Sequence, residues 1–227
     1  MTFSGFQKLT LLDFPGTVAC TLFTKGCNFR CPFCHNASLV NLTDTPAYSE
    51  EEILAFLKKR QGILEGVCIT GGEPLLHSEL PAFIAKVKAL GYKVKLDTNG
   101  SFPNRLIALV EEGLVDYVAM DVKNSFEKYP LTAGCETLNL PPIEQSIDFL
   151  LTKKVAFEFR TTVTAQTHTE EDILKIAERI KGADKYFIQN FVDSGDILEG
   201  NLSSVPQGKI EKMAKLAQNI VPNTKIR

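Results

Sequence analysis

TVACTLFTKGCNFRCPFCHN, residues 17–36, joins a strand-like run to a loop that holds three cysteines. Residues 17–23 are rich in β-branched and aromatic side chains, which favours a strand. Cys27, Cys31 and Cys34 follow directly, with three and two residues between them. Three thiolates this close together can converge on one inorganic centre without ligands from distant sequence.

Strand-like and helix-like segments alternate along the rest of the chain. The predicted strands are residues 17–23, 66–70, 93–96, 115–122, 155–163 and 186–189. The predicted helices begin at Ser49, with Glu52 completing a capping box, or lie around residues 83–87, 106–110, 143–151, 169–180 and 209–217. Six βα units need roughly 190 residues, because an eight-unit barrel needs about 250.

This alternation predicts an α/β fold, either an open doubly wound sheet or an incomplete barrel. We expect an incomplete (βα)6 TIM-like barrel of parallel strands, with the cysteine loop after the first strand. Both architectures place functional residues at the C-terminal ends of the strands.

Composition favours one cytoplasmic domain. The chain has 227 residues, 44% of them hydrophobic, and a formal net charge of −2. We expect a single domain over 1–227, with a leader at 1–16, the partial barrel at 17–195 and a C-terminal helix region at 196–227.

Neither end carries a basic block, and no apolar run approaches the roughly 20 residues that span a bilayer. Residues 1–6 do not resemble a secretory signal, so we expect a cytoplasmic protein without nucleic-acid or membrane partners.

The clustered cysteines favour a metal centre with an open coordination position. A closed zinc site needs four ligands, and His35 is poorly placed as the fourth because it follows Cys34 directly. Buried free thiols are the other alternative. A 4Fe-4S cluster held by three cysteines would leave one iron open to substrate chemistry. The remaining cysteines are scattered, at Cys20, Cys68 and Cys135.

Polar residues follow the next three predicted strands. They are Gly71, Gly72 and Glu73, then Asp97 and Asn99, then Asp121 and Lys123. Two glycines allow a ligand to approach the backbone closely, and Asp121 and Lys123 share one side of an extended segment. Helix capping or turn formation is the alternative for the two aspartates.

The spacing Cys27-x3-Cys31-x2-Cys34, with Phe33 before the last cysteine, resembles the radical S-adenosylmethionine (SAM) superfamily. The resemblance implies that the open iron binds the amino and carboxylate groups of S-adenosylmethionine. One electron then cleaves the sulfonium to methionine and a 5′-deoxyadenosyl radical. The run Gly71 to Pro74 resembles the superfamily's GGEP motif, whose backbone receives the methionine ammonium.

From about Gly5 to Gly195 the chain resembles one branch, the activating enzymes of glycyl radical enzymes. The matching features are Asp13 to Gly16, Cys34-His35-Asn36, the DTNG run Asp97 to Gly100, and the DxK pair Asp121 and Lys123. The runs Leu9 to Gly16 and Glu158 to Thr162 are most similar to anaerobic ribonucleoside-triphosphate reductase activating proteins.

This resemblance implies a set of site residues. The cluster ligands would be Cys27, Cys31 and Cys34. A monovalent cation would lie near Asp97. The S-adenosylmethionine contacts would be Phe33, His35, Gly71, Gly72, Glu73, Asp97, Asn99, Asp121, Lys123, Arg160 and Asn190.

The chain also departs from the branch. Val192 stands where activators of the formate-lyase type have a ribose-contacting histidine, so this contact would move to Gln189 or Asn190, or to water. No extra cysteines lie between Asn36 and Gly66, which predicts a single cluster. We interpret Cys68 as a core residue and expect His77 and His168 to be surface helix caps. A redox or second-metal role for Cys135 stays open, with no neighbouring ligand apparent in the sequence.

The resemblance implies an enzyme that cleaves S-adenosylmethionine and installs a glycyl radical on a partner, most similar to the activators of anaerobic ribonucleoside-triphosphate reductase. Reduced flavodoxin or ferredoxin would be the electron donor. The alternatives are a radical SAM enzyme that acts on a small molecule, and a non-catalytic iron-sulfur or zinc protein.

Overall fold

The computed structural model describes residues 1–41, 47–193, 195 and 197–227. The strands are β1 (Thr2–Phe3), β2 (Gly5–Thr10), β3 (Ala19–Thr24), β4 (Tyr48–Ser49), β5 (Gly66–Gly71), β6 (Lys93–Thr98), β7 (Tyr117–Asp121), β8 (Ala156–Val163), β9 (Tyr186–Asn190) and β10 (Thr224–Ile226). The helices are α1 (Ala37–Asn41), α2 (Glu50–Arg60), the 3-10 helix η1 (Pro74–Leu76), α3 (Leu80–Ala89), α4 (Pro103–Glu111), α5 (Tyr129–Thr132), α6 (Pro141–Leu151), α7 (Glu170–Arg179) and α8 (Gln207–Gln218). The predicted boundary at 195–196 adjoins residues 194 and 196, which lie outside the described residues.

The described strands form an open, mostly parallel sheet. Eight of them lie in the order β10-β9-β8-β7-β6-β5-β3-β2, and β1 pairs with β4 in a separate two-stranded sheet. The sheet is parallel from β3 to β10, whereas β2 is antiparallel to β3. The parallel strands follow one another in sequence order, without the reversal of order that a doubly wound sheet requires. This arrangement confirms the predicted partial barrel.

The sequence interpretation missed the two strands at the sheet edges. β2 lies within the predicted leader, and its exposed residues Gln7, Lys8 and Leu9 give no alternating burial pattern. β10 has only three residues, two of them exposed. Edge strands are half-solvated and short, so their hydrophobic pattern is weak. The inner strands, by contrast, are nearly continuous apolar runs.

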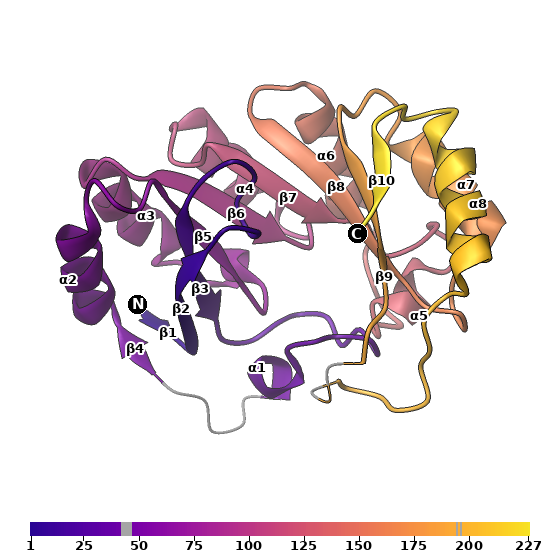
Figure 1. Cartoon of the computed structure of the whole chain (residues 1–227), viewed down its shortest axis with the longest axis horizontal. Helices are drawn as coiled ribbons and strands as arrows, with labels where there is room; N and C mark the ends of the chain where they lie inside the picture. The colour runs from indigo at the N-terminus through magenta and orange to yellow at the C-terminus, as the bar shows by residue number, and fades with distance from the viewer. Residues whose placement is uncertain (42–46, 194, 196) are drawn as a thin grey trace.

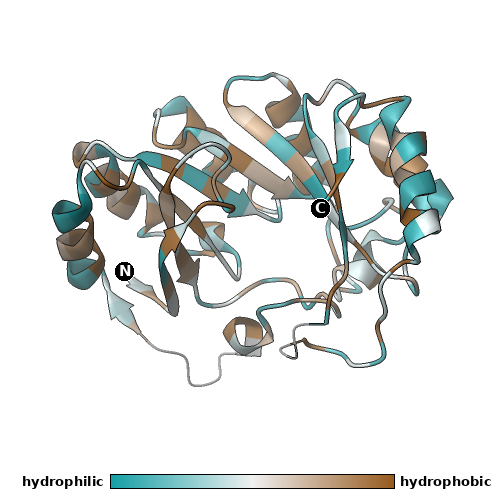
Figure 2. Cartoon of the chain, viewed as in Figure 1, coloured by the Kyte–Doolittle hydropathy of each residue, from teal (hydrophilic) through white to brown (hydrophobic). Residues whose placement is uncertain are grey.

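The helices cover the outside of the curved sheet. Figure 1 shows α2 and α3 at one end of the molecule and α7 and α8 at the other. Figure 2 shows hydrophilic and hydrophobic residues side by side along α2, α7 and α8, as expected of helices with one face on a core. The predicted capping box of Ser49 and Glu52 begins α2, and one formed by Thr169 and Asp172 begins α7. Within the described chain, no helix is both long enough and apolar enough to cross a membrane.

The inner face of the sheet is polar. Because side chains alternate along a strand, Val94 and Leu96 of β6 point toward the helices while Lys95 and Asp97 point to the inner face. The same alternation puts Arg160 of β8 on the inner face, and the register pairs it with Asp121 of β7. Charged side chains from three adjacent strands therefore meet inside the partial barrel.

Candidate active site

The three predicted cluster ligands line one cavity at the C-terminal ends of the strands. The cavity has a volume of about 370 Å³, and Cys27, Cys31 and Cys34 contribute to its wall. The other predicted site residues in the wall are Phe33, His35, Gly71, Gly72, Asp97, Asn99, Asp121, Lys123 and Arg160. Five segments far apart in sequence thus meet at one site.

Backbone hydrogen bonds fix the cysteine loop to other parts of the fold. The amide of Gly26 donates to Leu39 O at 3.0 Å, and that of Arg30 donates to Ala133 O at 2.9 Å. On the far side, the amide of Glu199 donates to Pro32 O at 3.1 Å. The loop is thus held by three segments that follow it in the sequence, in α1, after α5 and after β9.

The chemistry of the cysteine side chains fits an iron-sulfur cluster. Burial raises the pKa of Cys27 to about 11 and that of Cys31 to about 12, so these thiols release protons when they bind a metal. Among the described residues, no three His, Cys, Asp or Glu side chains are arranged to hold one metal ion. A cluster does not require this convergence, because each thiolate binds a different iron.

The glycine loop after β5 packs tightly against the cysteine loop. The amide of Gly72 donates to Thr24 O at 3.0 Å, and that of Glu73 donates to Gly26 O at 2.8 Å. Gly71 has a φ of +115°, and a Cβ on it would overlap the backbone of Thr24. A Cβ on Gly72 would overlap the carbonyl oxygen of Gly26. Only glycine allows the two loops to approach this closely.

Glu73 is buried beneath this loop rather than in the cavity wall. Its carboxylate accepts hydrogen bonds from Leu75 N at 3.0 Å, Thr98 Oγ1 at 2.8 Å and Asn99 N at 2.7 Å. Burial outweighs these bonds and raises the pKa of Glu73 to about 7. The structure therefore places Glu73 as a link between the loops that follow β5 and β6.

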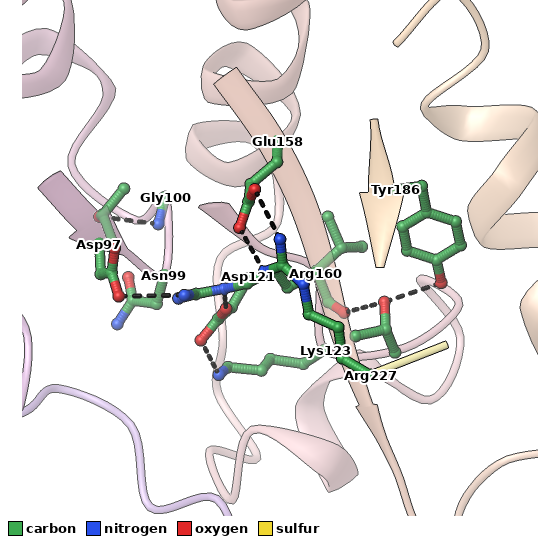
Figure 3. A network of polar contacts seen from close by, with 12 residues as sticks. Asp97, Asn99, Gly100, Asp121, Lys123, Glu158, Arg160, Tyr186 and Arg227 are labelled. Atoms are coloured by element: carbon green, nitrogen blue, oxygen red, sulfur yellow. Dashed lines mark hydrogen bonds and ion pairs between the residues drawn. The ribbon is translucent and has the colours of Figure 1, made fainter. Parts of the chain in front are cut away.

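Arg160 bridges the two aspartates of the cavity wall, as Figure 3 shows. Its Nη1 donates to Asp97 Oδ2 at 3.0 Å, and its Nε donates to Asp121 Oδ1 at 2.9 Å. Lys123 Nζ donates to Asp121 Oδ2 at 2.9 Å, and Lys95 Nζ bonds Asp97 Oδ1.

These ion pairs hold the charges of the wall in place. Burial alone would raise the pKa of Asp121, but Arg160 and Lys123 keep it well below its usual range. Burial likewise opposes the charge on Asp97, and Arg160 and Lys95 together lower its pKa. The pKa of Lys123 is raised by Asp121 despite burial. Asp97, Asp121 and Lys123 are therefore charged at neutral pH.

A second ion pair lies one layer deeper on the inner face. Arg227 Nη1 donates to Glu158 Oε1 at 3.0 Å, and the hydroxyl of Tyr117 donates to Glu158 Oε2 at 2.9 Å. Figure 3 shows Glu158 bonded to Arg227, with Arg160 close to Arg227. Only 1% of Glu158 is exposed, and both oxygens of its carboxylate accept a hydrogen bond.

The structure places Asn190 away from the cavity. Its side chain donates to Val205 O at 2.9 Å and accepts from Val205 N at 2.8 Å. Gln189, the preceding residue on the opposite face of β9, lines the cavity instead. Val192 is 68% exposed. Of the two residues weighed for ribose contact, only Gln189 has the position for it.

The prediction that His168 is a surface cap is wrong. Its ring is buried, with Nδ1 accepting from Thr164 N at 3.2 Å and Nε2 2.9 Å from Lys123 O. Burial lowers the pKa of His168, so the ring is neutral and Nε2 donates to this carbonyl. His168 therefore supports the backbone that presents Lys123. His77, by contrast, follows η1 at the surface, with Nε2 2.9 Å from Lys25 O.

Several residues of the site were not found from the sequence. Asp13, Thr21 and Thr162 line the cavity, and Lys95 lies behind Asp97. Alternation along the strands could have found two of them, because Thr162 lies two residues after Arg160 and Lys95 two before Asp97. Asp13 lies between β2 and β3, and its side chain accepts a hydrogen bond from Thr21 Oγ1, which no local pattern predicts.

Comparison with known proteins places the chain in a family. Residues 21–134 match the family model described as the radical SAM superfamily. A protein of Methanocaldococcus jannaschii, provisionally named a glycyl-radical enzyme activating enzyme, is 34% identical over 236 residues, covering 99% of this chain and 95% of that protein. The anaerobic ribonucleoside-triphosphate reductase-activating protein of Salmonella typhi is 30% identical over 93 residues, covering 40% of this chain and 60% of that protein.

A solved structure supports the fold. Native anSMEcpe with bound AdoMet matches with a TM-score of 0.66 and 20% identity, covering 89% of this chain and 61% of that one. The family model spans half of this chain, including all three clustered cysteines and the loops after β5, β6 and β7. The chain therefore belongs to the radical SAM superfamily, whose enzymes use a 4Fe-4S cluster and S-adenosylmethionine.

Proposed function

We propose that this protein is an activating enzyme that installs a glycyl radical on a partner enzyme, with anaerobic ribonucleoside-triphosphate reductase as that partner. The observation that carries the proposal is the match to the provisionally named activating enzyme over 99% of this chain and 95% of the relative. Similarity of the cysteine loop alone would not distinguish an activating enzyme from other members of the superfamily. The partial match to a reductase-activating protein supports the choice of partner.

In this proposal Cys27, Cys31 and Cys34 each bind one iron of a single cluster, and the fourth iron is left for S-adenosylmethionine. When both are bound, reductive cleavage of S-adenosylmethionine supplies a 5′-deoxyadenosyl radical. Reduced flavodoxin or ferredoxin supplies the electron. The buried wall residues Phe29 and Phe33 keep water away from the cavity.

The remaining wall residues orient the cofactor. Gly71 and Gly72 line the cavity, so their backbone carbonyl groups would receive the methionine ammonium. Lys123, held by Asp121, lies beside the cysteines and would attract the methionine carboxylate. Gln189 would contact the ribose.

The partner's glycine would approach through the open side of the sheet. Among the described strands, β2 and β10 are the two ends of the sheet order and do not pair with each other. A barrel open on one side can admit a polypeptide loop. The transfer of a hydrogen atom from the α-carbon of glycine to the adenosyl radical requires no general base. We place this chemistry in the cytoplasm, without nucleic-acid or membrane partners.

The test is electron paramagnetic resonance of the reconstituted protein under anaerobic conditions. With S-adenosylmethionine, a reductant and the anaerobic reductase, we expect a glycyl radical signal on the partner. Cys31→Ala should abolish cluster binding and the signal, whereas the matched change Cys135→Ala should preserve both, because Cys135 does not line the cavity.

The outcomes separate the competing functions. Cleavage of S-adenosylmethionine without a radical on any glycyl radical enzyme would contradict the proposal and favour a small-molecule substrate. A radical on a different glycyl radical enzyme would correct only the choice of partner. A cluster that does not coordinate S-adenosylmethionine would favour a non-catalytic iron-sulfur protein.

A further inference from the structure

The side chain of Lys95 is charged and lies inside the molecule. The residue is 1% exposed, and its ammonium bonds Asp97 Oδ1 on the inner face of the sheet. Its Nζ also lies 3.9 Å from the sulfur of Cys68. Lysine is rarely buried to this degree without a specific partner. Here the partner is a carboxylate of the cavity wall.

Such a pair contributes little to stability. Removing two charges from water costs about as much free energy as their attraction returns, and an apolar pair of similar volume is often at least as stable. Val94 and Leu96, on the other face of β6, already supply the packing against the helices. A buried lysine at this position therefore points to a role in the site.

Lys95 balances the charges around the cavity. Of the described residues in the cavity wall, three are carboxylates, Asp13, Asp97 and Asp121, and two are cationic, Lys123 and Arg160. Lys95 lies directly behind Asp97 and makes three cations against three carboxylates. Without it, the carboxylates of the wall would outnumber the lysine and arginine side chains around them by one.

A metal cation does not fit beside Asp97 in this arrangement. Asp97 bonds Lys95 through Oδ1 and Arg160 through Oδ2, and Asp121 bonds Arg160 through Oδ1 and Lys123 through Oδ2. All four oxygens of the two carboxylates therefore already have a cationic partner. A sodium or potassium ion at these oxygens would lie within a few ångströms of a fixed positive charge and be repelled by it.

We propose that the ammonium of Lys95 takes the place of the monovalent cation that the family resemblance implies near Asp97, so that this protein binds S-adenosylmethionine without potassium or sodium. Lys95 is then a positioning residue: it holds Asp97, which holds Arg160 in the cavity wall. The inference rests on the proposed S-adenosylmethionine site.

The test measures the affinity of the cluster-loaded protein for S-adenosylmethionine at equal ionic strength in potassium, sodium and tetramethylammonium chloride. For the natural protein we expect dissociation constants that agree within about twofold in the three salts. In Lys95→Met, which keeps the length of the side chain and removes its charge, affinity in tetramethylammonium should fall about tenfold, since Asp97 loses a buried partner. Potassium or sodium should restore it.

Lys93→Met is the matched control, because Lys93 lies on the same strand and is exposed. Its affinity should not depend on the salt. A loss of binding in Lys95→Met that is equal in all three salts, in protein with an unchanged circular dichroism spectrum, would mean a merely structural lysine and overturn the inference.

The natural protein decides the question even where Lys95→Met does not fold. Binding that needs potassium or sodium in the natural protein would overturn the inference and leave the proposed function standing. No binding of S-adenosylmethionine in any salt would overturn the proposed site and the inference with it.

Discussion

The carboxyl group of Glu73 accepts three hydrogen bonds, but burial has the larger effect on its pKa. Its pKa of about 7 exceeds the ordinary value of 4.5, so between these values the folded protein binds a proton that the unfolded chain has released. The stability contributed by this group is present below pH 4.5 and is lost as the pH rises through 7.

We therefore predict a pH-dependent difference between the natural protein and Glu73→Gln. Between pH 5 and pH 8 the free energy of unfolding of the natural protein should fall by up to about 3 kcal/mol relative to the variant, because each pKa unit corresponds to about 1.4 kcal/mol. Urea unfolding of the cluster-free protein measures it. The exposed Glu112→Gln should follow the natural protein at both pH values. Parallel curves for Glu73→Gln and the natural protein would contradict the prediction.

At the level of single residues, the sequence could predict those site residues that lie close together along the chain. The clustered cysteines and the pair Asp121 and Lys123 were recognisable because their neighbours in sequence are also neighbours in space. Whether Gln189 or Asn190 faces the cavity depends on the register of β9, which the sequence does not contain. Lys95 was overlooked because a charged residue in a strand normally indicates a solvent-exposed position.

Among the elements, the short strand β10 extends the sheet and leads into a buried ion pair. It adds a parallel strand beside β9, and the next residue, Arg227, supplies the ion pair to buried Glu158. Because the Arg227 side chain is 39% exposed, water screens part of this interaction.

Arg227→Ala should destabilise the fold by about 1–3 kcal/mol, since Glu158 would stay buried with the Tyr117 hydroxyl as a neutral donor. Chemical denaturation gives the value. Arg227→Lys should recover part of the loss. Lys225→Ala, which removes an exposed charge from the same strand, should have little effect. Equal stabilities for Arg227→Ala and Lys225→Ala would show that the pair with Glu158 adds nothing.

The elements that could be predicted are those with strong local signals. The capping boxes at Ser49 and Thr169 mark the starts of α2 and α7, since their side chains satisfy amides that no helix can satisfy itself. β2 and β10 have no such signal, because three of the six residues of β2 are exposed and β10 has only three residues.

Most of the apolar core of the whole molecule lies outside the cysteine loop. One group of buried residues runs through the inner strands and the covering helices, and the loop adds Phe29, Cys31 and Phe33 to it.

Removal of iron by a chelator should therefore leave a folded protein. We expect the far-ultraviolet circular dichroism of the apo and cluster-loaded forms to agree within about a tenth and thermal unfolding of both to be cooperative, with the midpoint of the apo form lower because bound metal stabilises the folded state. The comparison must be made anaerobically, and the apo form of Cys31→Ala serves as its control. Loss of the helical signal on iron removal would show instead that the metal organises the fold.

The contact between Gly72 and Gly26 also limits the substitutions that such proteins can accept as they diverge. Any added carbon at Gly72 would separate the two loops, so mutation has almost no freedom there. The segments that follow β2 and β9 have no comparable restriction, since Leu12 and Val192 are exposed to solvent. A lineage can therefore remodel the open side for a new partner by single, tolerated substitutions, while the radical chemistry is inherited without change.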